Sequence, residues 1–247
     1  MRYFIHLSYN GKNYCGWQRQ PHSLSVQEEL EKAMSLLLRE PIALVGAGRT
    51  DTGVHARNYF AHFDYTPSLP HNLVNKLNSF LPKEIAIKDI FSVSDSAHAR
   101  FDATSRTYQY FISLEKNPFL YEQSYYLFQS LDISLMNEAC KILFEFNDFQ
   151  CFSKTKTDVK TYICDIKNAF WEEKDNQLIF TITADRFLRN MVRAIVGTML
   201  NIGTKKINLT DFRAIIESKN RGLAGFSVPA NALFLVEVKY PSEIFIN

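Results

Sequence analysis

The chain has 247 residues, of which 46% are hydrophobic and 22% charged, values that are ordinary for a soluble globular protein. This length allows one large domain or two of ordinary size, and it supplies enough apolar surface for a core without disulfides or a structural metal. The net charge is only +2, so charge alone favours a well-mixed, solvated surface over an extended basic one.

Signals for a membrane or for an oxidising compartment are not found in the sequence. No apolar stretch is long enough to span a bilayer, and residues 1–6 lead directly into an alternating pattern without the apolar region of a signal peptide. The four cysteines form no Cys-x-x-Cys pair, and the six histidines have no metal-ligand spacing. We therefore expect a cytoplasmic protein that uses neither a metal nor a membrane.

The first half of the chain reads as strands interspersed with two helices. Residues 2–9 alternate between two faces and predict a strand. Ser25 and Glu28 form a capping-box pattern, which opens a helix with an apolar stripe that Pro41 ends. We also expect strands at 42–45, 58–63 and 85–93, and a short helix at 73–81.

Residues 94–104 read as a connection to a second half of mixed helices and strands. Residues 107–112 predict a strand with Tyr108 and Tyr110 on one face, and 115–130 is aromatic but irregular. Further elements are expected as a helix capped by Asp132, strands near 162–171 and 177–184, an apolar helix over 187–202, a shorter helix from Thr210, and a strand at 233–240. Because the order lacks the regular alternation of a doubly wound sheet, we predict an α+β fold with largely antiparallel sheets in two halves, 1–104 and 105–247.

The loop Gly46–His55 contains three glycines around one acid, Asp51, and one base, Arg49. Glycines at this density imply a tight backbone, and polar groups packed between two apolar strands are costly if they have no use. Asp51 is therefore the main candidate for a catalytic group, although an exposed turn would also contain glycine and aspartate.

Other types of site fit this loop less well. The third glycine comes too late for a dinucleotide fingerprint, no helix is expected after it, and the Gly-Lys-Ser/Thr of a Walker A loop is absent. Asp51-Thr52-Gly53 matches the short signature of an aspartic protease, which needs two such aspartates sharing a proton. Only one copy occurs here, so this alternative requires a homodimer.

Two further positions are candidates for chemistry. Arg193 lies between apolar neighbours in the expected helix 187–202, so we expect it to be largely buried and to need a carboxylate partner. Asp51 is a candidate partner, and Asp185 is the alternative if Arg193 lies on the exposed side of the helix. Tyr108 and Arg106 share a strand face and form a possible stacking platform for a nucleobase, although alternating tyrosines also fit a core.

Basic residues gather in the expected loops, an arrangement compatible with one basic cleft for a polyanion. They are Lys12 and Arg19; Arg49 and Arg57; Arg100 and Arg106; Lys154, Lys156 and Lys160; and Arg186, Arg189 and Arg193. Tyr14 and Trp17, near Arg19, are ambiguous between a stacking platform and a core in the same way as Tyr108.

Eight short pieces, in order along almost the whole chain, together resemble the TruA family of tRNA pseudouridine synthases. They are Tyr9-Asn10-Gly11 through Tyr14–Gln20, Ser25-Val26-Gln27, Gly48-Arg49-Thr50-Asp51, His98-Ala99-Arg100-Phe101, Arg106-Thr107-Tyr108, Phe149 near Phe152, Met191-Val192-Arg193 with Val196-Gly197, and Leu233 to Pro241. Each piece alone is weak, but eight in order are specific. Ala232 and Thr52 depart from the pattern, because many relatives have glycine and alanine at these positions.

The resemblance implies a role for each matching residue. Asp51 corresponds to the catalytic aspartate, Tyr108 to the active-site tyrosine and Arg193 to the basic residue paired with the aspartate. Leu233 corresponds to an apolar residue packed at the site, and Arg49 to one that contacts RNA around a flipped nucleotide. We add Arg19 and Arg106 as RNA-binding candidates.

The same resemblance implies two similar α+β halves with the active-site cleft between them, and a homodimer without cofactor that acts on uridines 38 to 40 in the anticodon stem-loop of tRNA. Breaking the N1–C1′ bond, rotating the uracil and joining C5 to C1′ involves no net redox change, so a carboxylate suffices. Two alternatives to a synthase remain. One is the homodimeric aspartic protease, and the other is a noncatalytic RNA-binding protein, which would tolerate loss of Asp51.

Overall fold

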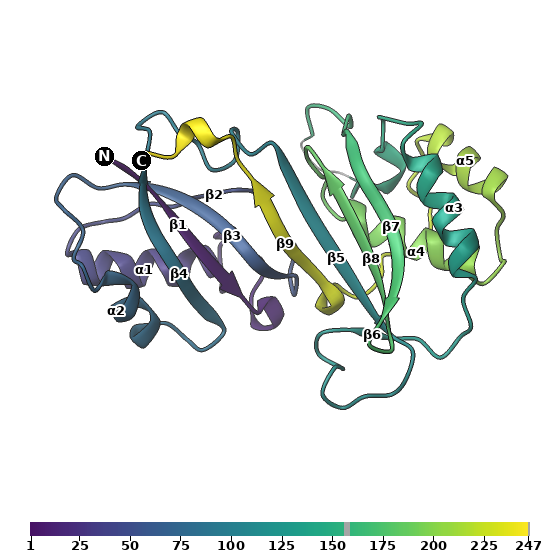
Figure 1. Cartoon of the computed structure of the whole chain (residues 1–247), viewed down its shortest axis with the longest axis horizontal. Coiled ribbons are helices and arrows are strands. Elements are labelled where there is room, and N and C mark those ends of the chain that lie inside the picture. The colour runs from purple at the N-terminus through teal and green to yellow at the C-terminus, as the bar shows by residue number, and fades with distance from the viewer. Residues whose placement is uncertain (156–158, 247) are drawn as a thin grey trace. The chain divides into compact units, whose positions relative to one another are not determined.

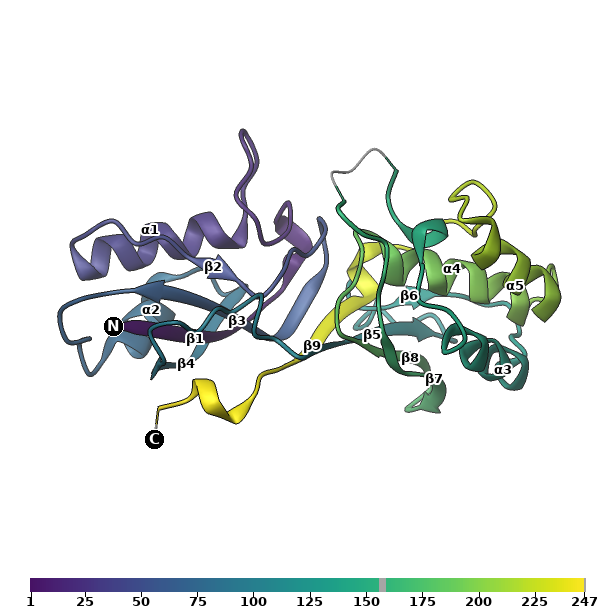
Figure 2. The same ribbon diagram turned by 90° about the horizontal axis from the view of Figure 1, so that it is seen from above.

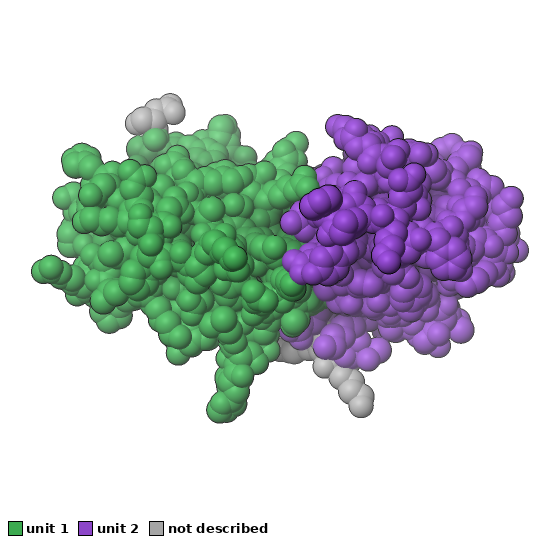
Figure 3. Space-filling model, turned by 90° about the horizontal axis from the view of Figure 1, so that it is seen from below, with its two compact units in different colours: residues 1–105, 234–247 green, residues 106–233 purple. Residues whose placement is uncertain are grey.

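The computed structural model describes residues 1–155 and 159–246, which form two compact units coloured separately in Figure 3. Unit 1 comprises residues 1–105 and 234–247, and unit 2 comprises residues 106–233. The sequence suggests a single division near residue 104, whereas in the structure the end of the chain packs with the first unit. Lys156 lies outside the described residues. Within the described residues, no helix combines the length and the apolar character that crossing a bilayer would take.

Unit 1 is built on a mixed sheet with the strand order β4-β1-β3-β9 (Figure 1). The three antiparallel strands are β1 (Arg2–Tyr9), β3 (His55–Asp64) and β4 (Ile85–Val93), close to the expected strands. The last strand, β9 (Leu233–Lys239), pairs with β3 in parallel, with Phe234 opposite His55. This pairing is the reason why residues 234–247 belong to unit 1.

Two helices cover one face of this sheet, α1 (Val26–Leu38) and α2 (Leu73–Phe80) (Figure 2). The Ser25 hydroxyl accepts a hydrogen bond from the Glu28 N–H (3.2 Å), as the capping pattern predicts. The apolar stripe of α1 is buried, and the helix ends at Leu38 because Arg39 adopts a left-handed conformation (φ 58°). The helix therefore ends before Pro41, and Arg39 is the residue that ends it.

The expected strand 42–45 exists only as the two residues of β2 (Val45–Gly46), which pair with β3. The reason lies in α1, whose side chains bind the backbone before Val45. The N–H of Ile42 donates to Ser35 Oγ (2.8 Å), and the N–H of Leu44 donates to Glu31 Oε1 (2.9 Å). A backbone whose donors are satisfied by side chains has no need of a neighbouring strand.

The opposite face of the unit 1 sheet is covered by the 94–104 connection and by the end of the chain. A hydrophobic cluster there contains Phe4, Val93, Ala97, Ala99 and Ile244. The Tyr240 hydroxyl fastens this cover by donating to the Ala99 carbonyl (2.6 Å). Phe4 is therefore buried on the second face of β1, whereas the alternating sequence suggests a single apolar face.

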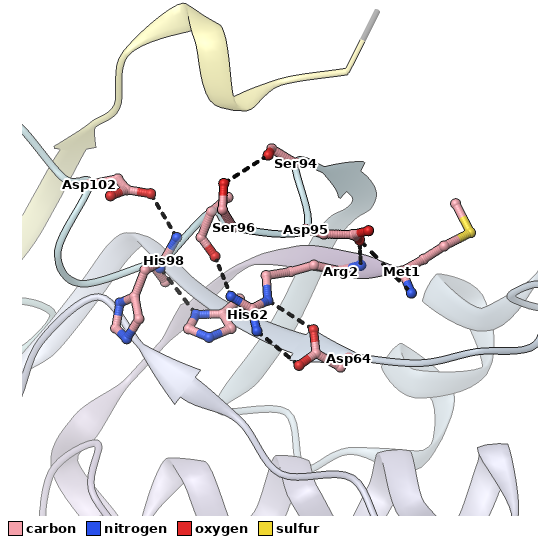
Figure 4. A network of polar contacts seen from close by, with 11 residues as sticks. Met1, Arg2, His62, Asp64, Ser94, Asp95, Ser96, His98 and Asp102 are labelled. Carbon is pink, nitrogen blue, oxygen red and sulfur yellow. Dashed lines mark hydrogen bonds and ion pairs between the residues drawn. The ribbon is translucent and has the colours of Figure 1, made fainter.

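A network of polar contacts holds the 94–104 connection against the sheet (Figure 4). Arg2 forms two hydrogen bonds with the Asp64 carboxylate (2.8 and 2.9 Å) and a third with the Ala97 carbonyl (2.9 Å). His62 is buried and accepts a hydrogen bond from the Ala99 N–H at Nδ1 (3.1 Å). Burial lowers the pKa of His62 to about 4, so its ring is neutral near pH 7, as an acceptor nitrogen requires.

Unit 2 contains an antiparallel sheet with the order β5-β8-β7 and three helices (Figure 1). Its strands are β5 (Ser105–Ser113), β7 (Ile166–Lys174) and β8 (Gln177–Ala184), and the two-residue β6 (Tyr125–Tyr126) pairs with the end of β5. The helices are α3 (Ile133–Leu143), α4 (Met191–Gly203) and α5 (Leu209–Ser218). The α+β class with largely antiparallel pairing is thus confirmed.

The apolar helix α4 lies in the core of unit 2. Eleven of its thirteen residues are buried, Arg193 and Asn201 being the exceptions. It begins at Met191 instead of residue 187, because residues up to Asn190 form a turn in which Asn190 is left-handed (φ 68°). Arg193 therefore lies in the first turn of the helix, where its backbone is close to the connecting segments of unit 2.

Candidate active site

The catalytic candidate Asp51 lies in unit 1, on the loop between β2 and β3. Residues 51–54 form a tight turn, closed by a hydrogen bond from the Val54 N–H to the Asp51 carbonyl (3.1 Å). Gly53, at the third position of this turn, has φ +79°, as a type II turn requires. Gly46 has a different reason to be glycine, because a Cβ there would overlap Tyr59 and Trp17. The tight backbone expected from the glycines is confirmed at these two positions.

Buried aromatic side chains form a floor under the loop. The Tyr59 hydroxyl donates to the Gly48 carbonyl (2.5 Å), and the rings of Tyr59 and Trp17 pack with centroids 4.2 Å apart. The buried Thr50 hydroxyl lies 2.9 Å from the Tyr9 hydroxyl and accepts a hydrogen bond from the Trp17 N–H (3.1 Å). The residue before Asp51 is therefore fixed from below by two separate elements.

Residues 11–17 support the loop from the side. The Gly53 N–H donates to the Tyr14 carbonyl (3.3 Å), and the Gly11 N–H donates to His55 Nδ1 (3.1 Å). Tyr14 and Trp17 are 3% and 2% exposed, so they belong to the core and are not the stacking platform considered from the sequence. His55 is also buried and stacks on Phe234, with centroids 4.5 Å apart, which makes it a packing residue.

The charged residues of the loop are less enclosed than their position between apolar strands suggests. Asp51 is half-buried and Arg49 is exposed, so the cost of burying an idle polar group applies only to His55. The side chain of Arg49 forms no hydrogen bond or ion pair with any of the residues that the structure describes. Arg19 lies further along the first loop, where its N–H donates to Gln27 Oε1 (3.0 Å) and its guanidinium lies 3.9 Å from the Glu28 carboxylate.

In unit 2, Tyr108 and Arg106 lie on the same face of β5 and both contact the turn after β8. Tyr108 is half-buried, and its ring meets Phe187 edge-to-face with centroids 5.1 Å apart. Arg106 donates from Nη1 to the Asp185 carbonyl (2.7 Å). The predicted shared face is therefore present, with the tyrosine ring held by an aromatic neighbour.

Arg193 is half-buried, so its side chain is less enclosed than those of its apolar sequence neighbours. The first turn of α4 is covered by a connecting segment instead of by another helix. Arg193 Nε donates to the Val228 carbonyl (2.7 Å), and the Val228 N–H donates back to the Arg193 carbonyl (3.3 Å). Asp185, the alternative partner, has its carboxylate 2.7 Å from the backbone N–H groups of Asp165 and Arg186, which donate to it.

The segment 227–233 organises the site residues of unit 2. The Tyr110 hydroxyl donates to the Pro229 carbonyl (3.0 Å), and burial raises the pKa of Tyr110, so this donor keeps its proton. Ser227 Oγ receives hydrogen bonds from Asn190 Nδ2 (2.7 Å) and Arg221 Nη2 (2.9 Å). Leu233, at the end of the segment, is buried.

Sequence reasoning missed the residues that position these groups. Thr50, Tyr9 and Tyr59 fix the Asp51 loop, and Tyr110 and Ser227 fix the segment that holds Arg193. The hydrogen bonds of Tyr110 and Ser227 reach residues at sequence separations of up to 119, so local spacing gives no signal for them.

Arg49 and Asp51 share one loop in unit 1, and Tyr108, Arg106, Arg193 and Leu233 belong to unit 2. The Asp51–Arg193 pair would join residues of different units, and it stays a prediction. No group of three or more His, Cys, Asp or Glu side chains in the described ranges is arranged to hold a metal ion.

Comparison with known proteins defines the class. The sequence model of a family described as tRNA pseudouridine synthase matches residues 139–241. A protein of Parabacteroides distasonis named tRNA pseudouridine synthase A is 54% identical over 246 residues, covering 99% of this chain and 98% of that protein. Proteins of the same name from Azobacteroides pseudotrichonymphae and Francisella tularensis subsp. holarctica are 52% and 36% identical, over 100% and 98% of this chain and 99% and 95% of theirs.

The matched ranges extend over both units, so they cover the loop of Asp51 as well as helix α4. The chain therefore belongs to the tRNA pseudouridine synthase A family. The resemblance found in eight short pieces of sequence is thereby confirmed.

Proposed function

We propose that this protein isomerises uridine to pseudouridine in tRNA and that Asp51 is the carboxylate that reacts. Membership of the family supports the reaction, and the setting of Asp51 is the structural observation that supports its role. Its backbone is fixed by the turn at Gly53 and by Thr50, whose hydroxyl contacts both Tyr9 and Trp17 through hydrogen bonds. Its side chain is half-buried. A reacting group held on a rigid backbone keeps its aim without losing access to substrate.

The remaining roles follow from the chemistry. The N1–C1′ bond of the target nucleotide breaks, the uracil turns, C5 bonds to C1′, and the C5 proton is released while N1 gains one. Asp51 can attack C1′ or C6 or remove a ribose proton, and in each case it must be ionised. Tyr108 packs on the extruded base and serves as acid or base for the C5 proton, and Arg193 pairs with the Asp51 carboxylate as its counter-charge.

The target base must leave its stack before this chemistry can begin. We propose that Arg49 occupies the vacated space, since its exposed guanidinium has no partner among the described residues. Arg19 and Arg106 contact the phosphate backbone, and Leu233 packs beside the flipped nucleotide. As in the family that the sequence resembles, the targets are uridines 38 to 40 of the anticodon stem-loop, and the protein acts in the cytoplasm as a homodimer. Sedimentation of the free protein tests the dimer.

The test of the reaction uses unmodified tRNA with tritium at C5 of uridine. Wild-type protein is expected to release tritium to water, and Asp51→Asn is expected to bind tRNA with wild-type affinity and release none. Asp175→Asn is the matched control, because Asp175 is an exposed acid in the left-handed turn between β7 and β8, where asparagine is also well tolerated. Near wild-type release by Asp51→Asn would contradict the assignment, and binding without release by the wild type would indicate a noncatalytic RNA-binding protein.

Arg193→Leu tests the pairing of Arg193 with Asp51. The substitution removes the hydrogen bond to the Val228 carbonyl and leaves the aspartate without its predicted counter-charge, so both turnover and melting temperature are expected to fall. Unchanged turnover together with an unchanged melting temperature would show that the pair does not form.

A further inference from the structure

Of the nine glycines in the chain, Gly48 and Gly222 are the two to which the protein itself gives little or no reason to lack a side chain, and Gly48 is the one that lies in the loop of Asp51. Six others lie where a Cβ would overlap another segment, namely Gly11, Gly16, Gly46, Gly197, Gly203 and Gly225. Gly53 has the positive φ of its turn. A Cβ on Gly48 would have no heavy atom of another described residue within 4 Å, and the φ of Gly48 is not in the left-handed region.

Gly48 is also poorly suited to be a hinge. Its carbonyl accepts a hydrogen bond from the Tyr59 hydroxyl (2.5 Å), and its N–H lies 3.4 Å from the same oxygen. On either side of it, the Ala47 N–H donates to the Phe60 carbonyl (2.8 Å) and Thr50 is bonded to two elements. A segment fastened at this many points does not use the flexibility of glycine, so the backbone entropy that glycine loses on folding has no return within the protein.

The open side of Gly48 is next to the residues proposed to act on RNA. Arg49 follows it directly, with an exposed guanidinium that has no partner among the described residues, and Asp51 is three positions further on. Glycine in such a place allows a ligand to come within van der Waals distance of the backbone. The absent side chain thus marks a path for the substrate.

We propose that a ribose of the bound tRNA packs directly on Cα of Gly48. The N–H and the carbonyl of Gly48 both face the Tyr59 hydroxyl, so the surface that remains is formed by the Cα hydrogens. This surface offers close contact without a strong hydrogen bond, which suits the C–H groups of a sugar ring better than a phosphate oxygen or a base edge. Arg49, one residue on, would then lie beside this nucleotide, where it can enter the space that the flipped base leaves.

This inference rests on the proposed function, and it makes Gly48 a positioning residue that acts through shape. A side chain at position 48 is expected to lift the ribose away from the loop and thereby displace the nucleotide relative to Asp51. Since displacements of about 1 Å cost on the order of 100-fold in rate, the loss should grow with the size of the side chain.

The experiment compares Gly48→Ala and Gly48→Val with wild type, by tritium release over a range of tRNA concentrations and by melting temperature. We expect kcat/KM to fall by about tenfold for alanine and about 100-fold for valine. The melting temperatures should stay equal to that of wild type or rise, because replacing an unstrained glycine restricts the unfolded chain.

Two matched glycines calibrate the result. Gly46→Ala is expected to lower the melting temperature, since its Cβ would overlap Tyr59 and Trp17. Gly222→Ala is expected to change neither quantity, since its Cβ would meet only the end of the Asn220 side chain, at 3.2 Å. These controls separate a glycine needed by the fold from one that the fold does not need.

Three outcomes would contradict the contact between the ribose and Gly48. Stable Gly48 variants with wild-type kcat/KM would overturn the ribose contact while leaving the proposed reaction intact. Gly48 variants that melt early, as Gly46→Ala should, would also overturn it, because the glycine would then serve the fold. If wild-type protein releases no tritium, the proposed function itself fails and the contact with it.

Discussion

Thr50→Val is the most informative single substitution beneath the catalytic loop. The side chains have similar volume, so the change removes a hydroxyl group and leaves the space filled. That hydroxyl accepts the hydrogen bond of the Trp17 N–H (3.1 Å), and it lies 2.9 Å from the Tyr9 hydroxyl. Trp17 is 2% exposed, so water cannot replace the lost acceptor.

A buried donor left without an acceptor costs about 1–3 kcal/mol. With about 2 kcal/mol lost, the melting temperature of a chain of this size is expected to fall by about 4–8 °C. Turnover should also fall, by at least about tenfold, when it is measured at a temperature where the variant is folded. The reason is that Thr50 fixes the backbone next to Asp51.

The assay is thermal unfolding followed by circular dichroism, together with tritium release measured well below the transition. Thr50→Ser is the control, since it keeps the hydroxyl and loses one methyl group, worth about 0.8 kcal/mol. It should therefore melt slightly early and retain turnover. If Thr50→Val melted within about 1 °C of wild type and kept its turnover, the hydroxyl would not be what holds the loop.

Further substitutions test other parts of the structure. Arg49→Ala should leave the melting temperature unchanged, because this exposed side chain has no partner among the described residues, and should reduce the slope of log K for tRNA against log salt by about one. An unchanged slope would show that the Arg49 guanidinium does not lie against the RNA. Ser227→Ala removes the acceptor shared by Asn190 and Arg221, so kcat should fall through misplacement of Val228 and Arg193, and Ser227→Thr should restore it. Equal kcat for the alanine and threonine variants would contradict this. Burial lowers the folded-state pKa of His62 from 6.5 to about 4, so unfolded chains bind more protons and stability should be lost as pH falls from about 6.5 towards 4. His62→Gln should flatten the dependence of melting temperature on pH in this window, and an identical pH profile would exclude His62 as its source.

The sequence predicts well those features that depend on neighbouring residues. The Ser25 and Asp132 caps are observed because a side-chain oxygen needs only the N–H three residues later. The strand at 85–93 also has the expected bounds, although Asp89 breaks its alternation and a bulge shifts its register against β1. The turn at Gly53 follows from the conformational freedom of one residue.

The sequence is less informative where distant segments decide the outcome. The strand expected at 42–45 is shortened because Ser35 and Glu31 of α1 take its N–H groups. Arg193 is half-buried because its apolar sequence neighbours face the core, while its own side chain reaches a carbonyl of a connecting segment. Neither partner can be inferred from the spacing of residues around the position.

The same limit applies to the candidate site. Asp51 and Arg49 could be proposed because they share one short loop. Arg193 and Tyr108 could be proposed from their sequence neighbours, and the family resemblance added Leu233. The floor of the loop could not be proposed, because the side chains of Tyr9, Trp17 and Tyr59 look like ordinary core residues until Thr50 and Gly48 are seen bonded to them.

The return of β9 to the first unit has a consequence for synthesis of the protein on the ribosome. Unit 1 lacks a strand of its sheet, and lacks the Tyr240 and Ile244 cover over Phe4, until the last residues of the chain have been made. Translation of the intervening unit 2 takes on the order of ten seconds. During that interval the exposed edge of β3 and the uncovered aromatic face would be available to chaperones or to other nascent chains. Unit 1, whose synthesis begins first, is thus completed only after unit 2 has been made.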